Sequence, residues 1–325
     1  MCKERMYEGS KKLNQSDFNT QNLKAKEENI SVFCKEILSS SHINFLFGAG
    51  VNGNALPQLD KFTNTKHLIN QKINDSNKTE NLDFEECINL IENEDDREKI
   101  KQVFIAEFKN FHKTALKKLD NGGNDSLNNL KDLLSCVYGI VKSAQNRNPS
   151  MKQINVYTLN YDDIVETLLD RLGYLHNTIS ASTSGIKASL MDVIGYDYTS
   201  RKYVPTFMVS KLHGDISNPI IPGKEKYKEV LNDDYFEIVF KMKEQLCRPN
   251  SCLIVIGYSG KDKHINKIIQ DCINSGLTIY WFKYSENDNP PKNWGSGIKV
   301  KEQADYKSAI DSTKLCYEDF ITIWV

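Results

Sequence analysis

The sequence predicts an α/β fold in which helices cover both faces of a parallel sheet, an arrangement called doubly wound. Short apolar runs of strand length alternate along the chain with segments whose apolar residues recur at helical spacing. Four of these runs end at or just before a motif of glycine or polar residues. Because ligands bind at the carboxyl ends of the strands in such sheets, the four motifs predict one shared site.

The composition is that of an ordinary globular protein with a large core, since 39% of the 325 residues are hydrophobic and 26% are charged. The net charge is −1, and no block of like charges favours nucleic-acid binding. No apolar run approaches the roughly 18 residues of a membrane span, and the polar N-terminus shows no secretory signal. We therefore expect a cytoplasmic protein that binds neither nucleic acid nor membrane directly.

The 8 cysteines are scattered along the chain and form no closely spaced pair of the kind that binds zinc. In a cytoplasm we expect them to be reduced and partly buried thiols. The sequence therefore predicts no metal site.

The N-terminal part begins with a polar, lysine-rich stretch over residues 1–28, which we interpret as a mobile or partner-dependent tail. The folded domain is predicted to span 29–325. Its first helix is expected over 30–38, where apolar residues follow helical spacing, and its first strand over 43–47. The strand ends abruptly at Gly48.

A helical insertion is predicted at about 60–149, packed beside the sheet. Apolar positions at helical spacing mark helices near 84–91, 103–111 and 127–141, and no convincing strand interrupts them. We interpret their aromatic and aliphatic residues as core rather than as a cofactor site.

The second half returns to alternating strands and helices. Strands are predicted at 154–158, 206–212, 252–256 and 277–284, with helices near 164–169, 235–246 and 265–272. Residues 180–202 are ambiguous, and we expect loop with some strand there.

The two glycine motifs each allow two interpretations. Gly48-Ala49-Gly50 can be only a tight turn, or it can bring backbone N–H groups close to a pyrophosphate. The turn from Gly257 to Ser259 precedes a helix, and either Ser259 or Asp262 can simply cap that helix. Alternatively, this turn can bind the adenosine half of a dinucleotide at the helix N-terminus.

The polar motifs also allow both a structural and a catalytic interpretation. Asn160 and Asp162 stand at a predicted helix start, where either can be a cap. Functionally, Asn160 can hold a water or a ribose hydroxyl, and Asp162 can orient a neighbour. His213 follows a predicted strand and precedes Gly214, and imidazole can act as a general base near neutral pH.

Together these motifs resemble those of the sirtuin family. Sirtuins carry Gly-Ala-Gly with a downstream Pro, then Thr-Gln-Asn-Ile-Asp, His-Gly and Gly-Thr-Ser. The counterparts in this chain are Gly48-Ala49-Gly50 with Pro57, Thr158-Leu159-Asn160-Tyr161-Asp162, His213-Gly214 and Gly257-Tyr258-Ser259. The resemblance spans residues 43 to about 275 and implies a Rossmann-like NAD-binding domain.

The Asn-Tyr-Asp and Gly-Tyr-Ser-x-x-Asp forms look more like the bacterial sirtuin-like antiphage-defence effectors than the protein deacylases. Those effectors are implied to hydrolyse NAD⁺ during phage infection. The paired-cysteine zinc module of the deacylases has no counterpart here, and Leu159 stands where they have Gln. The Phe-Arg that follows their Pro is absent after Pro57. These departures favour NAD⁺ cleavage over deacylation.

The resemblance implies a set of site residues. The implied catalytic residues are Asn160, Asp162 and His213. The implied NAD-binding residues are Gly48, Ala49, Gly50, Val51, Asn52, Pro57, Thr158, Tyr161, Gly257, Tyr258, Ser259 and Asp262.

We therefore predict an NAD⁺ glycohydrolase that releases nicotinamide and ADP-ribose. A protein deacylase and a non-catalytic NAD or ADP-ribose sensor are the alternatives. The resemblance also suggests self-assembly or a companion subunit such as a HerA-type ATPase.

Overall fold

The computed structural model describes residues 6–8, 11–12, 42–53, 55–57, 61–73, 87–88, 90–121, 125–144, 147–180, 192, 194–219, 233–282, 290–292, 294 and 298–301. The helix predicted over 30–38 lies outside this part of the chain. Half of the residues of the helix predicted near 84–91, and the end of the strand predicted over 277–284, also lie outside it.

A nine-stranded sheet forms the centre of the molecule, in the order β2-β1-β13-β12-β11-β3-β4-β8-β5. From β13 to β5 the neighbouring strands pair in parallel. The parallel strands are β3 (His42–Phe47), β4 (Gln153–Thr158), β5 (His176–Ser180), β8 (Thr206–Lys211), β11 (Ser251–Ile256), β12 (Thr278–Phe282) and β13 (Ile298–Lys301). Every residue of β4, β8 and β11 is buried, as expected for strands covered on both faces.

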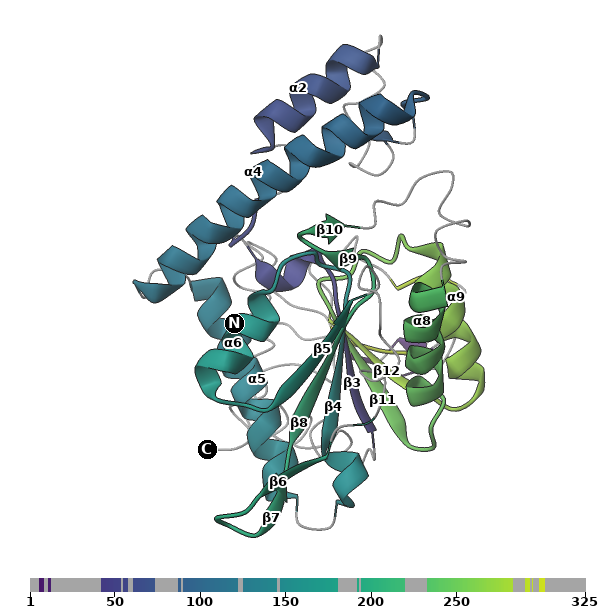
Figure 1. The fold of residues 1–325 in the computed structure, drawn as a ribbon. Helices are drawn as coiled ribbons and strands as arrows, with labels where there is room; N and C mark the ends of the chain where they lie inside the picture. Colours follow the sequence, from purple (N-terminus) through teal and green to yellow (C-terminus); the bar gives the residue numbers. More distant parts are fainter. Residues whose placement is uncertain are drawn as a thin grey trace, which may run out of the picture.

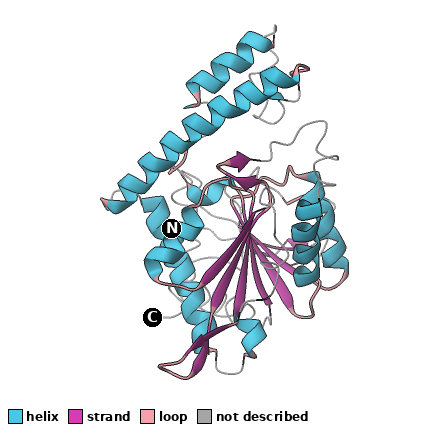
Figure 2. Ribbon diagram, viewed as in Figure 1, coloured by secondary structure: helices cyan, strands magenta, loops and turns pink. Residues whose placement is uncertain are grey.

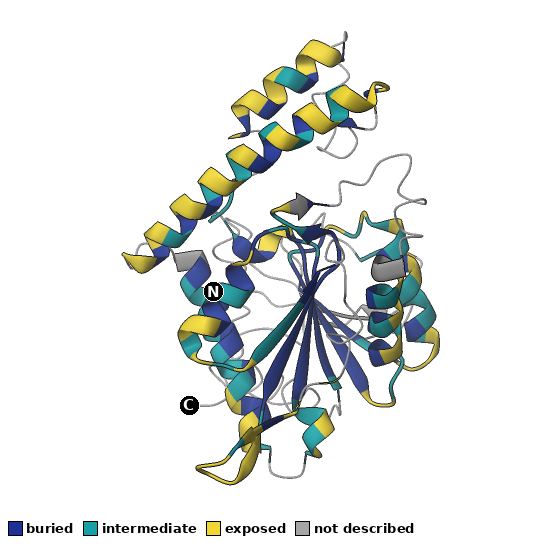
Figure 3. Cartoon of the chain, in the orientation of Figure 1, coloured by how far each residue is buried: buried dark blue, intermediate teal, exposed yellow. Residues whose placement is uncertain are grey.

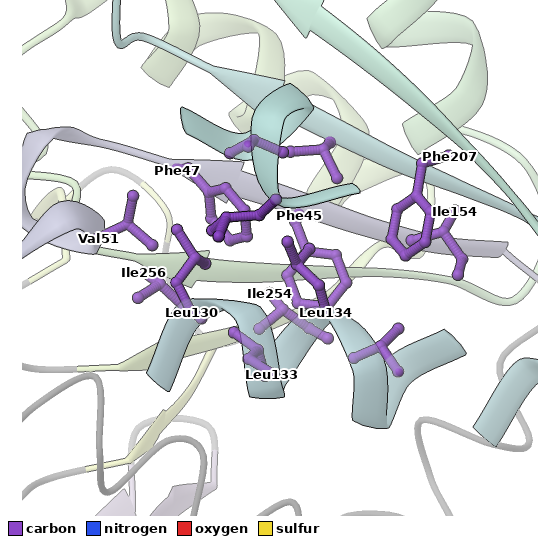
Figure 4. Packing of buried hydrophobic residues seen from close by; sticks show 14 of the residues in the cluster. Phe45, Phe47, Val51, Leu130, Leu133, Leu134, Ile154, Phe207, Ile254 and Ile256 are labelled. Carbon is purple, nitrogen blue, oxygen red and sulfur yellow. The ribbon is translucent and has the colours of Figure 1, made fainter. Parts of the chain in front are cut away.

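Helices cover both faces of this sheet, which confirms the predicted fold (Figures 1 and 2). The helices α5 (Asp125–Ser143) and α6 (Ile164–Leu172) pack on one face, and α8 (Asp233–Leu246) and α9 (Lys263–Asn274) on the other. Because successive strand residues face opposite sides, Phe45 and Phe47 enter the α5 layer while Leu46 enters the α9 layer. Figure 4 shows the two phenylalanines among leucines of α5.

The polar N-terminal stretch differs in part from the predicted tail. Strand β1 (Met6–Glu8) pairs antiparallel with β13, and β2 (Lys11–Lys12) pairs with β1. A sheet edge offers unpaired backbone groups, so a segment can add to it without an apolar pattern. The sequence periodicity therefore gave no signal for these strands.

Three smaller features complete the described structure around the sheet. The hairpin β6–β7 (Gly195–Asp197 and Lys202–Val204) overlaps the end of the ambiguous 180–202 segment. A second pair, β9–β10 (Gly214–Asp215 and Asn218–Pro219), follows β8 directly. The 3₁₀ turn η2 (Ala49–Asn52) follows β3 directly. A second 3₁₀ turn, η5 (Pro149–Lys152), directly precedes β4.

The predicted insertion contains α5, which belongs to the main core, and a separate pair of helices. These are α2 (Thr63–Lys72) and α4 (Glu94–Asp120). In Figure 1 these two helices lie beyond one end of the central sheet, the end near β9 and β10. The pair has its own aromatic cluster, in which Phe62 stacks on Phe104 at 5.2 Å between ring centroids. Figure 3 shows exposed residues along much of both helices.

Helix α4 has the sequence signals of a stable long helix. Asn93 caps it by accepting a hydrogen bond from the Asp96 backbone N–H at 3.1 Å. Acidic residues fill its first turn and lysines its last, which matches the helix dipole. Its buried residues join both the α2 cluster and the main core, so α4 connects the two.

Candidate active site

The four sequence motifs lie at the carboxyl ends of four adjacent strands. In the order β11-β3-β4-β8, Gly257 follows β11, Gly48 follows β3, Asn160 follows Thr158 of β4, and His213 follows β8. Hydrogen bonds link neighbouring motifs along this edge. The structure thus brings together the motifs that the sequence placed at separate strand ends.

The two glycine turns pack against each other backbone to backbone. The Gly48 and Gly50 N–H groups donate to the carbonyl oxygens of Ile256 and Gly257, at 3.1 and 3.0 Å. A Cβ atom on Gly48 would lie 2.3 Å from the Gly257 carbonyl oxygen, and one on Gly257 would lie 2.3 Å from the Val51 nitrogen. Gly257 also has a φ of +67°, which side-chain-bearing residues rarely adopt. The glycines are therefore required first by the fit between the two turns.

The turn after β3 divides into an exposed and a buried part. Ala49 and Gly50 are exposed, whereas Val51 and Asn52 are buried, with Val51 in the α5 core. Pro57 is half-buried. The exposed backbone at 49–50 can be approached by a ligand, and the predicted contact with pyrophosphate stays a prediction.

Asn160 anchors the first turn from the neighbouring strand. Its side-chain Nδ2 donates to the Gly48 carbonyl oxygen at 3.2 Å, and its backbone N–H donates to the Thr158 hydroxyl at 3.1 Å. The residue is 7% exposed. The capping interpretation of Asn160 is wrong, because the helix α6 begins at Ile164 and Asp163 occupies its N-cap position. Thr158 is buried and supports Asn160.

Asp162 contacts both the first residue of α6 and the turn after β3. Its Oδ1 accepts from the Ile164 backbone N–H at 3.1 Å, and its Oδ2 accepts from Asn52 Nδ2 at 2.8 Å. Burial raises the pKa of this carboxyl, although the charge of Lys211 opposes the shift. Within the described part of the chain, the buried Oδ1 of Asn52 has no hydrogen-bond partner. A buried acceptor without a partner is costly unless a ligand or water satisfies it.

His213 pairs with Asp262 across the edge. The His213 Nε2 lies 2.8 Å from Asp262 Oδ2, and both side chains are almost fully buried. Asp262 Oδ1 also accepts from the backbone N–H groups of His264 and Ile265, so the predicted capping of α9 by Asp262 is confirmed. Because a carboxylate only accepts hydrogen bonds, Nε2 carries the proton and Nδ1 is the acceptor of the neutral ring.

Three of the residues predicted to bind NAD take no part in the hydrogen bonds described above between the strand-end motifs. The buried Tyr258 packs near Trp281 and donates to Asn266 Oδ1 at 2.8 Å, within the α9 core. The Tyr161 ring packs against Phe104 and Phe108 of α4. Ser259 is exposed. We therefore assign structural roles to the side chains of Tyr258 and Tyr161.

Residues 154–305 match the family model of the SIR2-like domain. The chain carries a SIR2-like domain. The matched residues include Asn160, His213 and Gly257, and the strands from β4 to β13. The turn after β3 precedes them, but its hydrogen bonds join it to the same edge. No curated protein matches the chain.

The SIR2-like domain also contains a buried ion pair that our sequence reasoning missed. Lys211 Nζ donates to the Asp162 carbonyl oxygen and lies 3.2 Å from Glu166 Oε1. Burial raises the pKa of Glu166, and the charge of Lys211 opposes this shift. The sequence shows a lysine at the end of the predicted strand over 206–212, two residues before His213, but it gives no sign of the partner Glu166.

Two further findings concern the described residues alone. They contain no group of three or more histidine, cysteine, aspartate or glutamate side chains that could hold a metal ion. None of their helices has the length and apolar character to cross a membrane. A SIR2-like domain is compatible with an NAD-utilising enzyme, and the metal-free site stays a prediction.

Proposed function

We propose that the SIR2-like domain hydrolyses NAD⁺ at the nicotinamide–ribose bond and releases nicotinamide and ADP-ribose. The observation that carries this proposal is the buried His213–Asp262 pair, which shares one sheet edge with Asn160 and the two glycine turns. A histidine oriented by a carboxylate is a general base with a fixed tautomer. The edge thus combines a base, a polar side chain and accessible turn backbone.

The chemistry requires little acid catalysis. Nicotinamide leaves as a neutral base from a cationic precursor, so the leaving group needs no proton. The transition state resembles an oxocarbenium ion, as in other glycosidic cleavage. What the protein must supply is a held ribose, a positioned water and an acceptor for the proton of that water.

Each of these tasks can be assigned to a side chain. His213 Nδ1 accepts the proton of the attacking water, and Asp262 stabilises the resulting imidazolium through Nε2. Asn160 is held through its Nδ2, so its amide oxygen can accept from the water or from a ribose hydroxyl. Neither role requires a metal ion.

Asn52 fits a hydrogen-bond donor of the substrate better than the pyrophosphate. Its Nδ2 is engaged by Asp162, so the free group is the acceptor Oδ1. An acceptor does not bind phosphate oxygens, which are acceptors themselves. We therefore propose that Asn52 receives a ribose hydroxyl or the nicotinamide carboxamide. We also propose that the Ala49 backbone N–H approaches the pyrophosphate, because the Gly50 N–H already donates to Gly257.

The biological role that fits this activity is NAD⁺ depletion in antiphage defence. This step rests on the resemblance of the motifs to bacterial sirtuin-like effectors. An enzyme that destroys NAD⁺ must be controlled, which favours a trigger and an assembled state. Self-assembly or a companion such as a HerA-type ATPase remains a prediction.

The test is to incubate the purified protein with NAD⁺ and separate the products by chromatography. Hydrolysis gives nicotinamide and free ADP-ribose in equal amounts. A protein deacylase instead gives O-acetyl-ADP-ribose, and only when an acetylated peptide is added. A sensor binds NAD⁺ in calorimetry and leaves it intact, and either of the last two results contradicts the proposal.

A further inference from the structure

The residues that follow β4 present their side chains alternately to two different elements. Asn160 and Asp162 contact the turn after β3, through Gly48 and Asn52. The residues next to them in sequence, Tyr161 and Asp163, contact α4. The 160–163 loop is therefore held between the candidate site on one side and the long helix on the other.

The aromatic side of this contact is formed by Tyr161. Its ring meets Phe104 and Phe108 of α4 edge to face, with centroid distances of 6.1 and 6.3 Å. Such arrangements are favourable for aromatic pairs at these distances. Phe104 also stacks on Phe62, so the same cluster links Tyr161 to the segment before α2.

The charged side of this contact is formed by Asp163. His112 Nε2 of α4 lies 2.6 Å from Asp163 Oδ1. The His112 side chain is 11% exposed and the Asp163 side chain 53%, so water reaches the carboxylate. The pair thus joins a nearly buried side chain of α4 to a solvent-exposed carboxylate of the loop.

The charges around His112 favour its protonated form. Burial alone would lower its pKa, but the carboxylate of Asp163, and then that of Asp162, outweigh burial and raise it. Lys211 opposes this rise. Reciprocally, His112 lowers the pKa of Asp163.

We propose that α4 positions the 160–163 loop for catalysis, with His112 acting through Asp163 and the Phe104–Phe108 pair acting through Tyr161. This inference rests on the proposed function and assigns His112 as a positioning residue, not a catalytic one. It also gives the insertion a role: a change in the placement of α4 moves Asn160 and Asp162 relative to the turn after β3. Two contacts, one on each side of Asp162, transmit that placement.

The experiment compares wild type, His112→Gln, Asp163→Asn and the double variant, with His67→Ala on α2 as the control because His67 is exposed. For NAD⁺ hydrolysis we expect kcat to fall about 10–100-fold in each single variant, as for partners that orient a catalytic group. The melting temperature should stay close to that of wild type. The double variant should be no slower than the slower single variant, because both changes break the same contact.

A pH profile separates positioning from a merely structural role. As the pH rises through the raised pKa of His112, the ion pair is lost and wild-type kcat should decline. In His112→Gln this alkaline decline should be absent. An unchanged kcat in a folded His112→Gln protein, or an alkaline limb that persists in it, would overturn the inference.

Hydrogen exchange tests the inference independently of turnover. Peptides that cover 159–165 should take up deuterium faster in His112→Gln than in wild type or His67→Ala, and peptides of β11 should not change. If wild type fails to cleave NAD⁺, the proposed function fails while this measurement still tests the positioning. Equal uptake at 159–165 in all three proteins contradicts the positioning role.

Discussion

The two halves of the candidate site are built by different means. In the β3–β11 half, the turns fit together through their backbones, and added Cβ atoms at Gly48 or Gly257 would lie 2.3 Å from backbone atoms. In the β4–β8 half, the contacts are hydrogen bonds of Asn160, Asp162 and His213. The comparison teaches that the first half depends on shape and the second on functional groups. Mutations should therefore damage folding in one half and chemistry in the other.

The largest effect is expected from Gly257→Ala, which attacks the shape-dependent half. The positive φ alone costs about 1–3 kcal/mol for a residue with a side chain, and the contact with Val51 adds to this. We expect a strong loss of stability in urea unfolding, together with loss of activity. Gly139→Ala is the matched control, because a Cβ there meets nothing within 4 Å and the residue lies in α5. Wild-type stability of Gly257→Ala would contradict the role of shape.

The next largest effect is expected from His213→Ala, in the half that depends on functional groups. Loss of a general base lowers turnover by about 10²–10⁴-fold. The thermal melt should remain cooperative, because the change removes no backbone hydrogen bond of the edge. His67→Ala on the exposed face of α2 controls for the loss of a histidine. A folded His213→Ala protein with wild-type turnover would remove His213 from the mechanism.

Much of this site was predictable from the sequence because its signals are local. An apolar run of strand length followed by glycine or by Asn-x-Asp gives both the strand and the position of its carboxyl end. The strand β5 was missed because His176, Asn177 and Thr178 give it no apolar run, and an edge strand needs none. The contacts of His112 with Asp163 and of Lys211 with Glu166 were not predictable, because they depend on how distant segments pack.

Asp262→Asn sharpens the comparison, because Asp262 serves structure and chemistry with different oxygens. Asn caps helices as well as Asp does, so the stability of α9 should be kept. If the amide oxygen of the introduced asparagine keeps the cap, an NH₂ donor replaces the carboxylate oxygen that faces His213 Nε2, so the tautomer of His213 is no longer fixed and turnover should fall, at most by roughly 10⁴-fold. Thermal melts and initial rates with NAD⁺ measure the two effects. Unchanged turnover would show that His213 works without this partner.

The smallest effect concerns the pH dependence of stability and the buried Glu166. Its pKa is raised in the folded protein, so the folded state binds more protons than the unfolded state above the ordinary pKa of glutamate. Stability should therefore decrease as the pH rises from that ordinary value through the raised one. Urea unfolding at several pH values should show a weaker dependence in Glu166→Gln than in wild type. An equal dependence in both proteins would assign it to other groups, such as Asp162.

The most direct test of the shared site is a crystal structure of His213→Ala with NAD⁺ bound. The variant should bind the dinucleotide and cleave it slowly enough for it to be observed. The account predicts the nicotinamide ribose beside Asn160 and Asn52, and the pyrophosphate along the backbone at 49–50. NAD⁺ bound away from the carboxyl ends of β3, β4, β8 and β11, or no binding by a folded protein, would contradict it.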